Sequence, residues 1–454
     1  MMRKCLFWDG RPREAPGVAP LLIIALAAFY AASLLTGCAP GHPSTTTSGS
    51  AVNPGTSVAT SLPTTSLPSA TSSPPTSAAA ALPVPWYLTR GGPKQDQGWA
   101  VDVDTQGNIY FGTHQQEPTA TYADMVIYKF APDGRELWKT RWGGRFMEKT
   151  FVVVAAGERA LVGGLQYGSG DLTDADMAVL SLDAGTGEVV WSFTWGQGYG
   201  YEEVDGLAVD GDDIYVSGWT TGKTTGNDVA LLKLTAEGKL VWAQTWGTNG
   251  WDQGDGQLAV DADSVYVAGR YNGANMLVGG KAFVASFSKD TGKLVADETW
   301  GGPIFTDGLG LTADADHLYV VGLTLDKGKG GQIFLRKFDK KLRLVWERVW
   351  GGAKSESARA VAVDTSGNVL VAGETGSEGA GGLDFVLLRY SPAGNLQWAH
   401  TWGGPEDEGA LGIALHGGSA FIAGKTRGFG NGGDEALLVS VDGATGQFPA
   451  LVGE

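Results

Sequence analysis

A Trp-Gly pair recurs along the chain at an almost constant distance, and this period limits the possible folds more than any other feature. Successive tryptophans are 50 to 54 residues apart, and an arginine stands 52 residues before the first of them. We call these residues, one in each repeat, the marks; they are Arg90, Trp142, Trp195, Trp246, Trp300, Trp350 and Trp402. Periods near 50 residues with several short strands per unit are typical of β-propellers. The sequence therefore predicts seven repeated units.

The unit at 204–246 shows how each repeat is expected to fold. Two apolar runs, "GLAVD" and "IYVSG", are separated by the turn "GDD", and two more, "VALLKL" and "LVWAQTW", are separated by "TAEGK". Four runs bounded by turn residues predict one four-stranded antiparallel blade. The 70 glycines and a charged fraction of only 18% agree with many tight turns. The predicted fold class is all-β, a seven-bladed β-propeller of four-stranded antiparallel blades.

The stretch "PVPWYLTRGGP", 83–93, reads like the end of a repeat placed at the beginning. Trp86 stands four residues before Arg90, as Trp398 stands four before Trp402. The last unit lacks such a strand and ends in "TGQFPALVGE". We therefore expect 84–90 to supply the missing outer strand and close the ring, which would protect the sheet edges. The C-terminal tail is the alternative occupant, because an outer strand tolerates proline.

The first 37 residues have the pattern of a targeting segment. A basic start is followed by the apolar run 18–35 and by "LTGC", 35–38. This tetrapeptide resembles the lipobox of bacterial lipoproteins, which implies cleavage after Gly37, lipidation of Cys38 and a stable membrane anchor. An uncleaved transmembrane anchor is the alternative, since 18 apolar residues are just enough to span a bilayer. Both interpretations place the rest of the chain outside the cytoplasm, at the cell envelope.

The segment 38–82 joins the lipidated cysteine to the propeller, predicted at 83–454. After Cys38 it contains no Lys, Arg, Asp or Glu and is rich in Ser, Thr, Pro and Ala, which predicts a disordered tether. Removal of the signal takes away four of the 33 basic and two of the 49 acidic residues and leaves a net charge of −18. Nucleic acid and anionic lipid head groups are therefore not expected as partners.

The units resemble the bacterial β-propeller repeat often called SBBP. "GGPKQDQGWAVDVDTQGNIYFGT" and "WGGAKSESARAVAVDTSGNVLVAGET" carry the resemblance best, whereas the pattern is broken at Arg90, Gln197 and Thr248. The resemblance implies a propeller on an exported protein and no single activity. "LDAGTGEVVW", 182–191, also resembles the docking motif of pyrroloquinoline-quinone dehydrogenases and of the propeller lipoprotein in outer-membrane barrel assembly. The alternative interpretation of this motif is a hairpin turn followed by a buried tryptophan.

Two acidic sets recur near the loops of one face. The first stands six or seven residues after each mark and is predicted to ring the mouth of the central channel: Asp96, Glu148, Glu202, Asp252, Asp307, Glu356 and Glu408. The second precedes the third strand of most units: Asp124, Asp176, Asp228, Asp384 and Asp434, with Lys281 and Gln332 in units four and five. These carboxylates either accept backbone N–H groups and pin adjacent blades, or form a ligand or cation site, with calcium as the candidate ion.

Catalytic motifs are not found in the sequence. There is no HExxH, GxSxG, phosphate-binding loop or CxxC, and the loops keep nearly one length in every unit. The chain is therefore predicted to be a monomeric, non-enzymatic binding scaffold for a protein or glycan. Two alternatives remain open. One is an enzyme that uses the ring carboxylates on a polysaccharide, and the other is a scaffold in outer-membrane protein assembly.

Overall fold

The computed structural model describes residues 71–73, 85–170, 174–197, 200–221, 226–273, 279–302, 304–326, 329–430 and 433–451. The chain divides into two compact units, 1–49 and 50–454, and every described residue belongs to the second. The predicted signal, Cys38 and most of the tether lie outside the described residues. Among the residues that are described, no helix is long and apolar enough to cross a membrane.

The described residues form an all-β fold, as predicted. Each repeat gives a run of antiparallel strands joined by short turns. The first two repeats hold β3 (Gln97–Val103), β4 (Ile109–Gln115), β5 (Asp124–Phe130), β6 (Glu136–Trp142), β7 (Glu148–Ala156), β8 (Arg159–Tyr167), β9 (Ala175–Asp183) and β10 (Val189–Trp195). The third and fourth hold β11 (Glu202–Asp210), β12 (Asp213–Thr221), β13 (Asn227–Thr235), β14 (Leu240–Trp246), β15 (Trp251–Gln253), β16 (Ala259–Val260), β17 (Ser264–Gly273), β18 (Gly279–Ser288) and β19 (Leu294–Trp300).

The remaining repeats continue the same order. The fifth and sixth hold β20 (Phe305–Ala313), β21 (His317–Leu325), β22 (Gly331–Asp339), β23 (Leu344–Trp350), β24 (Glu356–Val363), β25 (Val369–Thr375), β26 (Asp384–Tyr390) and β27 (Leu396–Trp402). The seventh holds β28 (Glu408–His416), β29 (Ser419–Thr426) and β30 (Glu435–Asp442). Its fourth strand is β2 (Trp86–Arg90), which pairs antiparallel with β30 from Trp86 opposite Ser440 to Arg90 opposite Ala436.

Two features depart from a simple series of four-stranded sheets. The third and fourth repeats share one nine-stranded sheet, because Asn227 of β13 bridges in parallel to Trp251 of β15. The inner strand of the fourth repeat is split into the short β15 and β16. In the predicted tether, β1 (Thr71–Ser73) pairs antiparallel with the outer strand β6, with Thr71 opposite Arg141.

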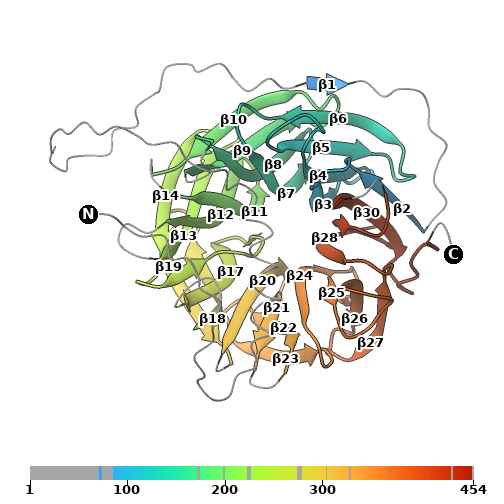
Figure 1. Cartoon of the computed structure of the whole chain (residues 1–454). Helices are drawn as coiled ribbons and strands as arrows, with labels where there is room; N and C mark the ends of the chain where they lie inside the picture. The colour runs from blue at the N-terminus through green and yellow to red at the C-terminus, as the bar shows by residue number, and fades with distance from the viewer. Residues whose placement is uncertain are drawn as a thin grey trace, which may run out of the picture. The chain divides into compact units, whose positions relative to one another are not determined.

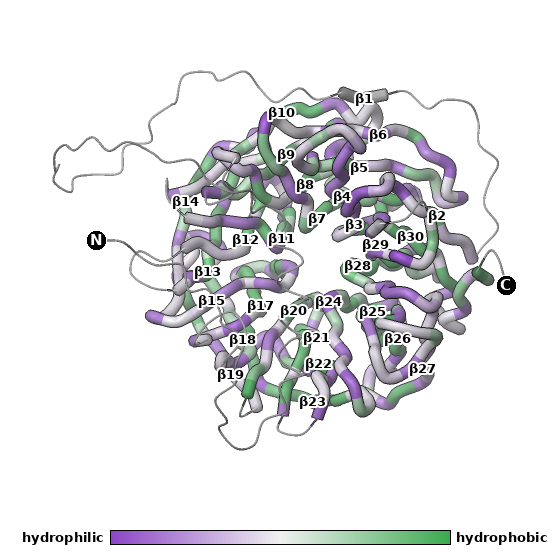
Figure 2. Tube along the Cα trace, in the orientation of Figure 1, coloured by the Kyte–Doolittle hydropathy of each residue, from purple (hydrophilic) through white to green (hydrophobic). Residues whose placement is uncertain are grey.

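The sheets are arranged radially, as in a β-propeller (Figure 1). The first strand of each repeat, such as β7, β20 or β28, lies nearest the centre, and the last, such as β10, β23 or β27, lies at the periphery. The core sits between consecutive sheets: Tyr110, Met125 and Trp138 of the first repeat pack with Val162 and Leu180 of the second. Strands around the centre are accordingly mostly apolar (Figure 2). Each sheet is stabilised by its neighbours rather than alone.

The inner strands carry a β-bulge at one repeated position. Pairing of the inner strand with its neighbour shifts between Gly98 and Ala100 in the first repeat and between Val204 and Gly206 in the third. The residues bypassed by these shifts are Trp99, Phe151, Asp205, Leu309, Arg359 and Leu411. A bulge leaves one residue unpaired and changes the direction of its side chain. These six residues therefore differ in orientation from their neighbours.

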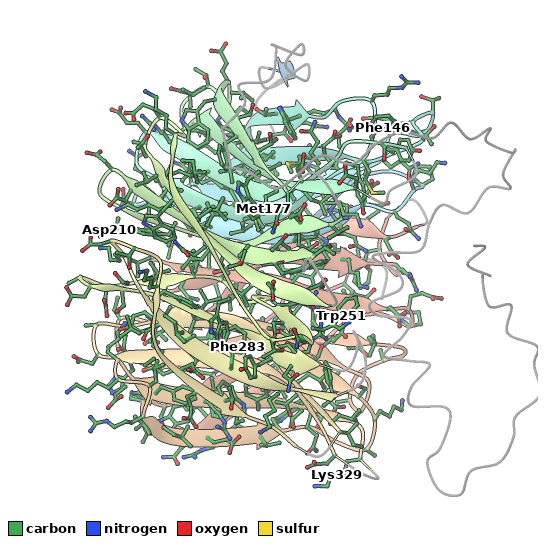
Figure 3. All side chains as sticks on the ribbon, turned by 90° about the vertical axis from the view of Figure 1, so that its left-hand side faces the viewer. Phe146, Met177, Asp210, Trp251, Phe283 and Lys329 are labelled. Carbon is green, nitrogen blue, oxygen red and sulfur yellow. The ribbon has the colours of Figure 1, made fainter. Side chains whose placement is uncertain are left out.

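The loops fall on two faces, visible when the molecule is turned by 90° (Figure 3). Phe146, in the connection from the first repeat to the second, and Trp251, at the start of β15, lie on the same side as Lys329, which stands between the second and third strands of the fifth repeat. Asp210, at the turn between the first and second strands of its repeat, lies on the opposite side. Connections between repeats and loops between second and third strands therefore share one face, which we call the loop face.

Candidate functional site

The first acidic set is buried where consecutive repeats meet. All seven side chains are no more than 1% exposed. Asp96 accepts the backbone N–H groups of Gly92 and Gln116, each at 2.7 Å, and Glu408 accepts that of Gly404 at 2.7 Å and the Thr426 hydroxyl at 2.9 Å. Carboxylates in this arrangement fix the connection between repeats. Burial and these bonds favour the structural interpretation of the set over an open ring at the channel mouth.

The fifth repeat differs from the others by one position. Thr306, not Asp307, accepts the backbone N–H of Gly302 at 3.0 Å and pairs with Thr324 at 3.1 Å, as Glu408 does with Gly404 and Thr426. Asp307 instead lies 3.6 Å from the guanidinium of the fully buried Arg270. Asp307 is therefore not equivalent to the other six residues. A threonine replaces the carboxylate, and motif spacing alone could not show this.

The second acidic set explains the glycine of the Trp-Gly pair. A Cβ on Gly196 would lie 1.7 Å from Asp176 Oδ1, and one on Gly403 would lie 2.3 Å from Asp384 Oδ1 and 2.7 Å from Glu408 Oε2. The glycine thus leaves room for two carboxylates from consecutive repeats. Their proximity and burial have an electrostatic consequence. Burial, with a smaller contribution from the charge of Asp124, raises the pKa of Glu148 to about 8.

The side chains that line the axis were missed by sequence reasoning. A cavity of about 40 Å³ is lined by the bulge residues Trp99, Phe151, Asp205, Leu309, Arg359 and Leu411, together with Asp255 and Gln257 of the fourth repeat. Six of these eight residues stand three positions after a member of the first acidic set; Leu309 stands two after Asp307, and Gln257 stands five after Asp252. The bulge accounts for the six residues outside the fourth repeat, and a bulge is not visible in an alternating pattern. A cavity of this volume holds little more than a water molecule.

Opposite charges meet at this axis. Burial, and then the charge of Asp307, raises the pKa of Asp255 to about 8, while Arg270 and Arg359 oppose the shift. Burial and the charge of Glu203 raise the pKa of Asp205 well above its usual range. Arg359 also lies 5.6 Å from the ring of Trp99. Buried carboxylates, an arginine and aromatic side chains therefore lie together at the axis.

The acidic residues do not fit a shared calcium site. Within the part of the chain that the structure describes, no three His, Cys, Asp or Glu side chains come together as a group able to hold a metal ion. Calcium prefers six to eight oxygen ligands, whereas the first acidic set is distributed around the molecule, one residue at each junction.

A polar pocket of about 850 Å³ lies on the loop face between the second and third repeats. Its lining includes Trp195 at the end of β10, Gln197 in the connection that follows, and Asp228 and Gln244 of the third repeat. The connection to the fourth repeat contributes Thr248 and Asn249, and the other lining residues are Gly, Ala and Thr. Gln244 and Asn249 are exposed, and Trp195 and Asp228 are half-buried. Among the described residues, the lining thus combines amide, hydroxyl and carboxylate groups with the indole of Trp195; Gln197 Nε2 donates to Thr220 Oγ1 at 3.2 Å, and Thr248 Oγ1 donates to Asp252 at 2.7 Å.

The pocket coincides with a break in the repeat. In the other five units the second residue after the mark is glycine, Gly92, Gly144, Gly302, Gly352 or Gly404, but units three and four have Gln197 and Thr248 there. Both polar residues line the pocket. The broken motif was visible in the sequence, but the sequence could not show that two breaks in consecutive units share one cavity.

Comparison with known proteins gives only distant structural similarity. No family model and no curated protein matches the chain. Among solved structures, the WD40 β-propeller domain of Doa1 has 13% identity and a TM-score of 0.48, covering 78% of this chain and 97% of that one. The quinohemoprotein alcohol dehydrogenase from Comamonas testosteroni has 12% identity, a TM-score of 0.46 and coverages of 82% and 78%. The WD40 domain of Neurospora crassa Pan2 has 10% identity and a TM-score of 0.47, covering 76% of this chain and 89% of that one.

Proposed function

We propose that this chain is a membrane-anchored, exported propeller lipoprotein that acts as a non-enzymatic binding scaffold for a protein or glycan at the cell envelope. The observation that carries the proposal is the polar pocket of about 850 Å³ on the loop face. Its volume lies within the range of about 300–1,000 Å³ that is common for ligand sites. The described residues of its lining contribute hydrogen-bonding groups and an aromatic residue, and among them no general acid and nucleophile form an activated pair.

The proposal includes seven blades closed into a ring by β2. Among the described residues, each pair of consecutive repeats shares a hydrophobic cluster, and one such cluster joins the seventh repeat to the first. That cluster contains Trp86 and Leu88 of β2, Phe421 of β29, and Val101 and Phe111 of the first repeat. The pairing of β2 with β30 and this continuous core support closure by the N-terminal strand.

Membrane anchoring rests on the sequence. The "LTGC" motif at 35–38 supports lipidation of Cys38, and the neutral segment that follows would hold the propeller away from the bilayer. The net charge of −18 after the signal favours partners other than nucleic acid and anionic lipid.

Two observations favour binding over catalysis. The axis carboxylates surround a cavity of about 40 Å³, which cannot admit a polysaccharide. His114 is 6% exposed, and burial, assisted by the charge of Lys149, lowers its pKa to about 3, so it remains neutral and enclosed at physiological pH. These observations count against the polysaccharide-acting alternative.

The test is chemical crosslinking of intact cells that express the affinity-tagged full-length chain, followed by identification of the attached molecules. We expect a protein or glycan of the envelope, recovered intact, and loss of this product with Cys38→Ser, which should also remain unprocessed and unlabelled by fatty acid. Recovery of a cleaved polysaccharide would instead favour the enzyme, and recovery of barrel-assembly components would favour the assembly scaffold. Normal maturation and acyl labelling of Cys38→Ser would contradict the anchor.

A further inference from the structure

We propose that one side of the molecule's periphery rests on the surface of the bilayer to which the chain is anchored; this inference rests on the proposed lipid anchor and adds the orientation of the domain. The region is formed by the first residues of three outer strands, β14, β19 and β23, which follow one another along the periphery (Figure 1). We call it the aliphatic rim, and it consists of Leu240, Val241, Leu294, Val295, Leu344 and Val345.

Exposed apolar side chains are confined to the outer strands. Among the described residues, all nine exposed large hydrophobic side chains belong to the outer strands of repeats two to six, and every one is a valine or a leucine. The aliphatic rim holds six of the nine, with exposed fractions from 39% at Leu294 to 64% at Val295. Exposed apolar residues that gather in one region, rather than scatter singly, mark a contact surface.

A second repeated bulge accounts for the exposure of the valines. Pairing of the third strand with β14 skips Val241, and pairing in the next two repeats skips Val295 and Val345 at the same position. A skipped residue is left unpaired, and its side chain changes direction. Repeat six has Gln397 at this position. The sheet therefore does not require an apolar residue there, and the three valines need another explanation.

A cation precedes each Leu-Val pair of the aliphatic rim. Lys239, Lys293 and Arg343 stand directly before the three pairs, and all are exposed. Repeats two and six, on either side of the rim, have Glu188 and Asn395 at this position. A long basic side chain suits the bilayer interface, because its stem lies along apolar surface while its charge reaches the head-group phosphates. Cation, leucine and valine thus coincide in three consecutive repeats.

The composition of the aliphatic rim favours lipid over a protein partner. Protein interfaces concentrate aromatic side chains and are depleted of lysine, whereas the rim has only leucine and valine beside two lysines and one arginine. The rim also follows the outer edge of the radial arrangement (Figure 1). A bilayer surface can receive aliphatic side chains from such an edge without a matching cavity, since its acyl boundary is fluid.

The position of the aliphatic rim gives the orientation. An outer strand ends at its mark, next to a connection on the loop face, so its first residues lie toward the opposite face, where Asp210 lies (Figure 3). Lys289, in the turn that leads to β19, accordingly contacts Asp210. Asp210 and Asp212 are exposed there, so we expect contact through the rim rather than through the whole acidic face. The loop face, with its polar pocket, then points away from the bilayer.

The test uses the full-length chain, purified with its anchor and reconstituted in vesicles of phosphatidylcholine. A photoreactive side chain replaces Val295 in one protein and Gln397, the exposed residue at the same bulge of repeat six, in another. After irradiation, mass spectrometry measures the lipid that is attached to each protein. We expect lipid adducts from position 295 and almost none from position 397.

The neighbouring valines provide a second measurement. Val241→Gln with Val345→Gln, in the protein that carries the photoreactive residue at 295, gives repeats three and five the residue of repeat six. We expect about tenfold less lipid adduct, because two apolar side chains no longer enter the interface. Val349→Gln is the matched control and should change nothing, since Val349 is 52% exposed on the same strand as Val345 but lies farther from the start of that strand. Melting temperatures show whether each variant is folded.

Equal lipid adducts from positions 295 and 397, or none from 295, would overturn the inference. Adducts between two copies of the chain in place of lipid would show a protein contact and would also overturn it. If the wild type is labelled by fatty acid and Cys38→Ser is not, the anchor stands after either result and only the orientation fails. Normal acyl labelling of Cys38→Ser would remove the anchor and this inference with it.

Discussion

At the scale of single residues, tryptophans of the outer strands act together with glycines of the next repeat. Trp191 donates its indole N–H to the carbonyl of Ala236 at 3.0 Å, and Trp138 donates to Ala184 at 3.1 Å. A Cβ on Gly238 would lie 2.7 Å from the ring of Trp191. Gly187 has the same relation to Trp138, so the "GTG" of 182–191 is accounted for as a turn beneath a tryptophan. This contact connects the hairpin of one repeat to the outer strand of the preceding one.

We predict that Gly238→Ala destabilises the protein more than Gly211→Ala. Both glycines have a positive φ, +77° and +61°, which costs an alanine about 1–2 kcal/mol. A Cβ at Gly211 would meet nothing within 4 Å, whereas the one at Gly238 would meet the Trp191 ring, which adds about 1–3 kcal/mol. Thermal and chemical unfolding of the two variants measures the difference. Equal losses of stability would contradict the tryptophan contact.

Glu148 should make stability depend on pH. Its pKa is raised by burial from 4.5 in an open chain to about 8, so the folded state holds a proton that the unfolded state has released. Stability contributed by this site therefore falls as pH rises from about 4.5 to about 8. We expect Glu148→Gln to melt like the wild type near pH 4.5 and above it near pH 8.5. Glu188→Gln, at an exposed position, is the control. A difference that does not change with pH would contradict this assignment.

At the scale of strands, the sequence predicts that a strand is present better than it predicts how that strand pairs with its neighbours. Apolar runs between Gly-rich turns predicted four strands per repeat, and the register of β11 to β14 agrees. The bulges, the split inner strand β15–β16 and the bridge between β13 and β15 were not predictable. Each depends on how a sheet meets its neighbours, and local alternation of apolar and polar residues carries no information about that contact.

Removal of β2 should be far more harmful than removal of the C-terminal tail. β2 pairs with β30 over five residues, and Trp86, 3% exposed, packs 6.2 Å from the Phe421 ring. Loss of such a tryptophan from a core costs about 3–5 kcal/mol. We therefore expect deletion of Trp86–Arg90 to lower the melting temperature much more than deletion of Ala450–Glu454. Equal melting temperatures would show that another segment occupies the edge of β30.

At the scale of the whole molecule, the features that recur in every repeat belong to the common fold. Residues that break the repeat distinguish one region of the loop face from the others. The acidic residues, the Trp-Gly glycines and the Trp–turn contacts recur around the fold, and several of them hold one repeat against the next. Repetition made them easy to find in the sequence. Gln197 and Thr248 break the pattern, and the structure brings them to one pocket. Sequence alone could not do so, because it gives no distances across a loop face.

The central claim is that the proposed propeller binds its partner at one place, beside Gln197 and Thr248. A photoreactive side chain can be introduced singly at Gln244, Glu298 and His400, three exposed positions that each stand two residues before the Trp mark of their repeat. Irradiation of cells expressing each full-length variant then reports what lies next to each repeat. The account predicts adducts from Gln244 and none from Glu298 or His400. Equal adducts from all three positions, or none from Gln244, would contradict it.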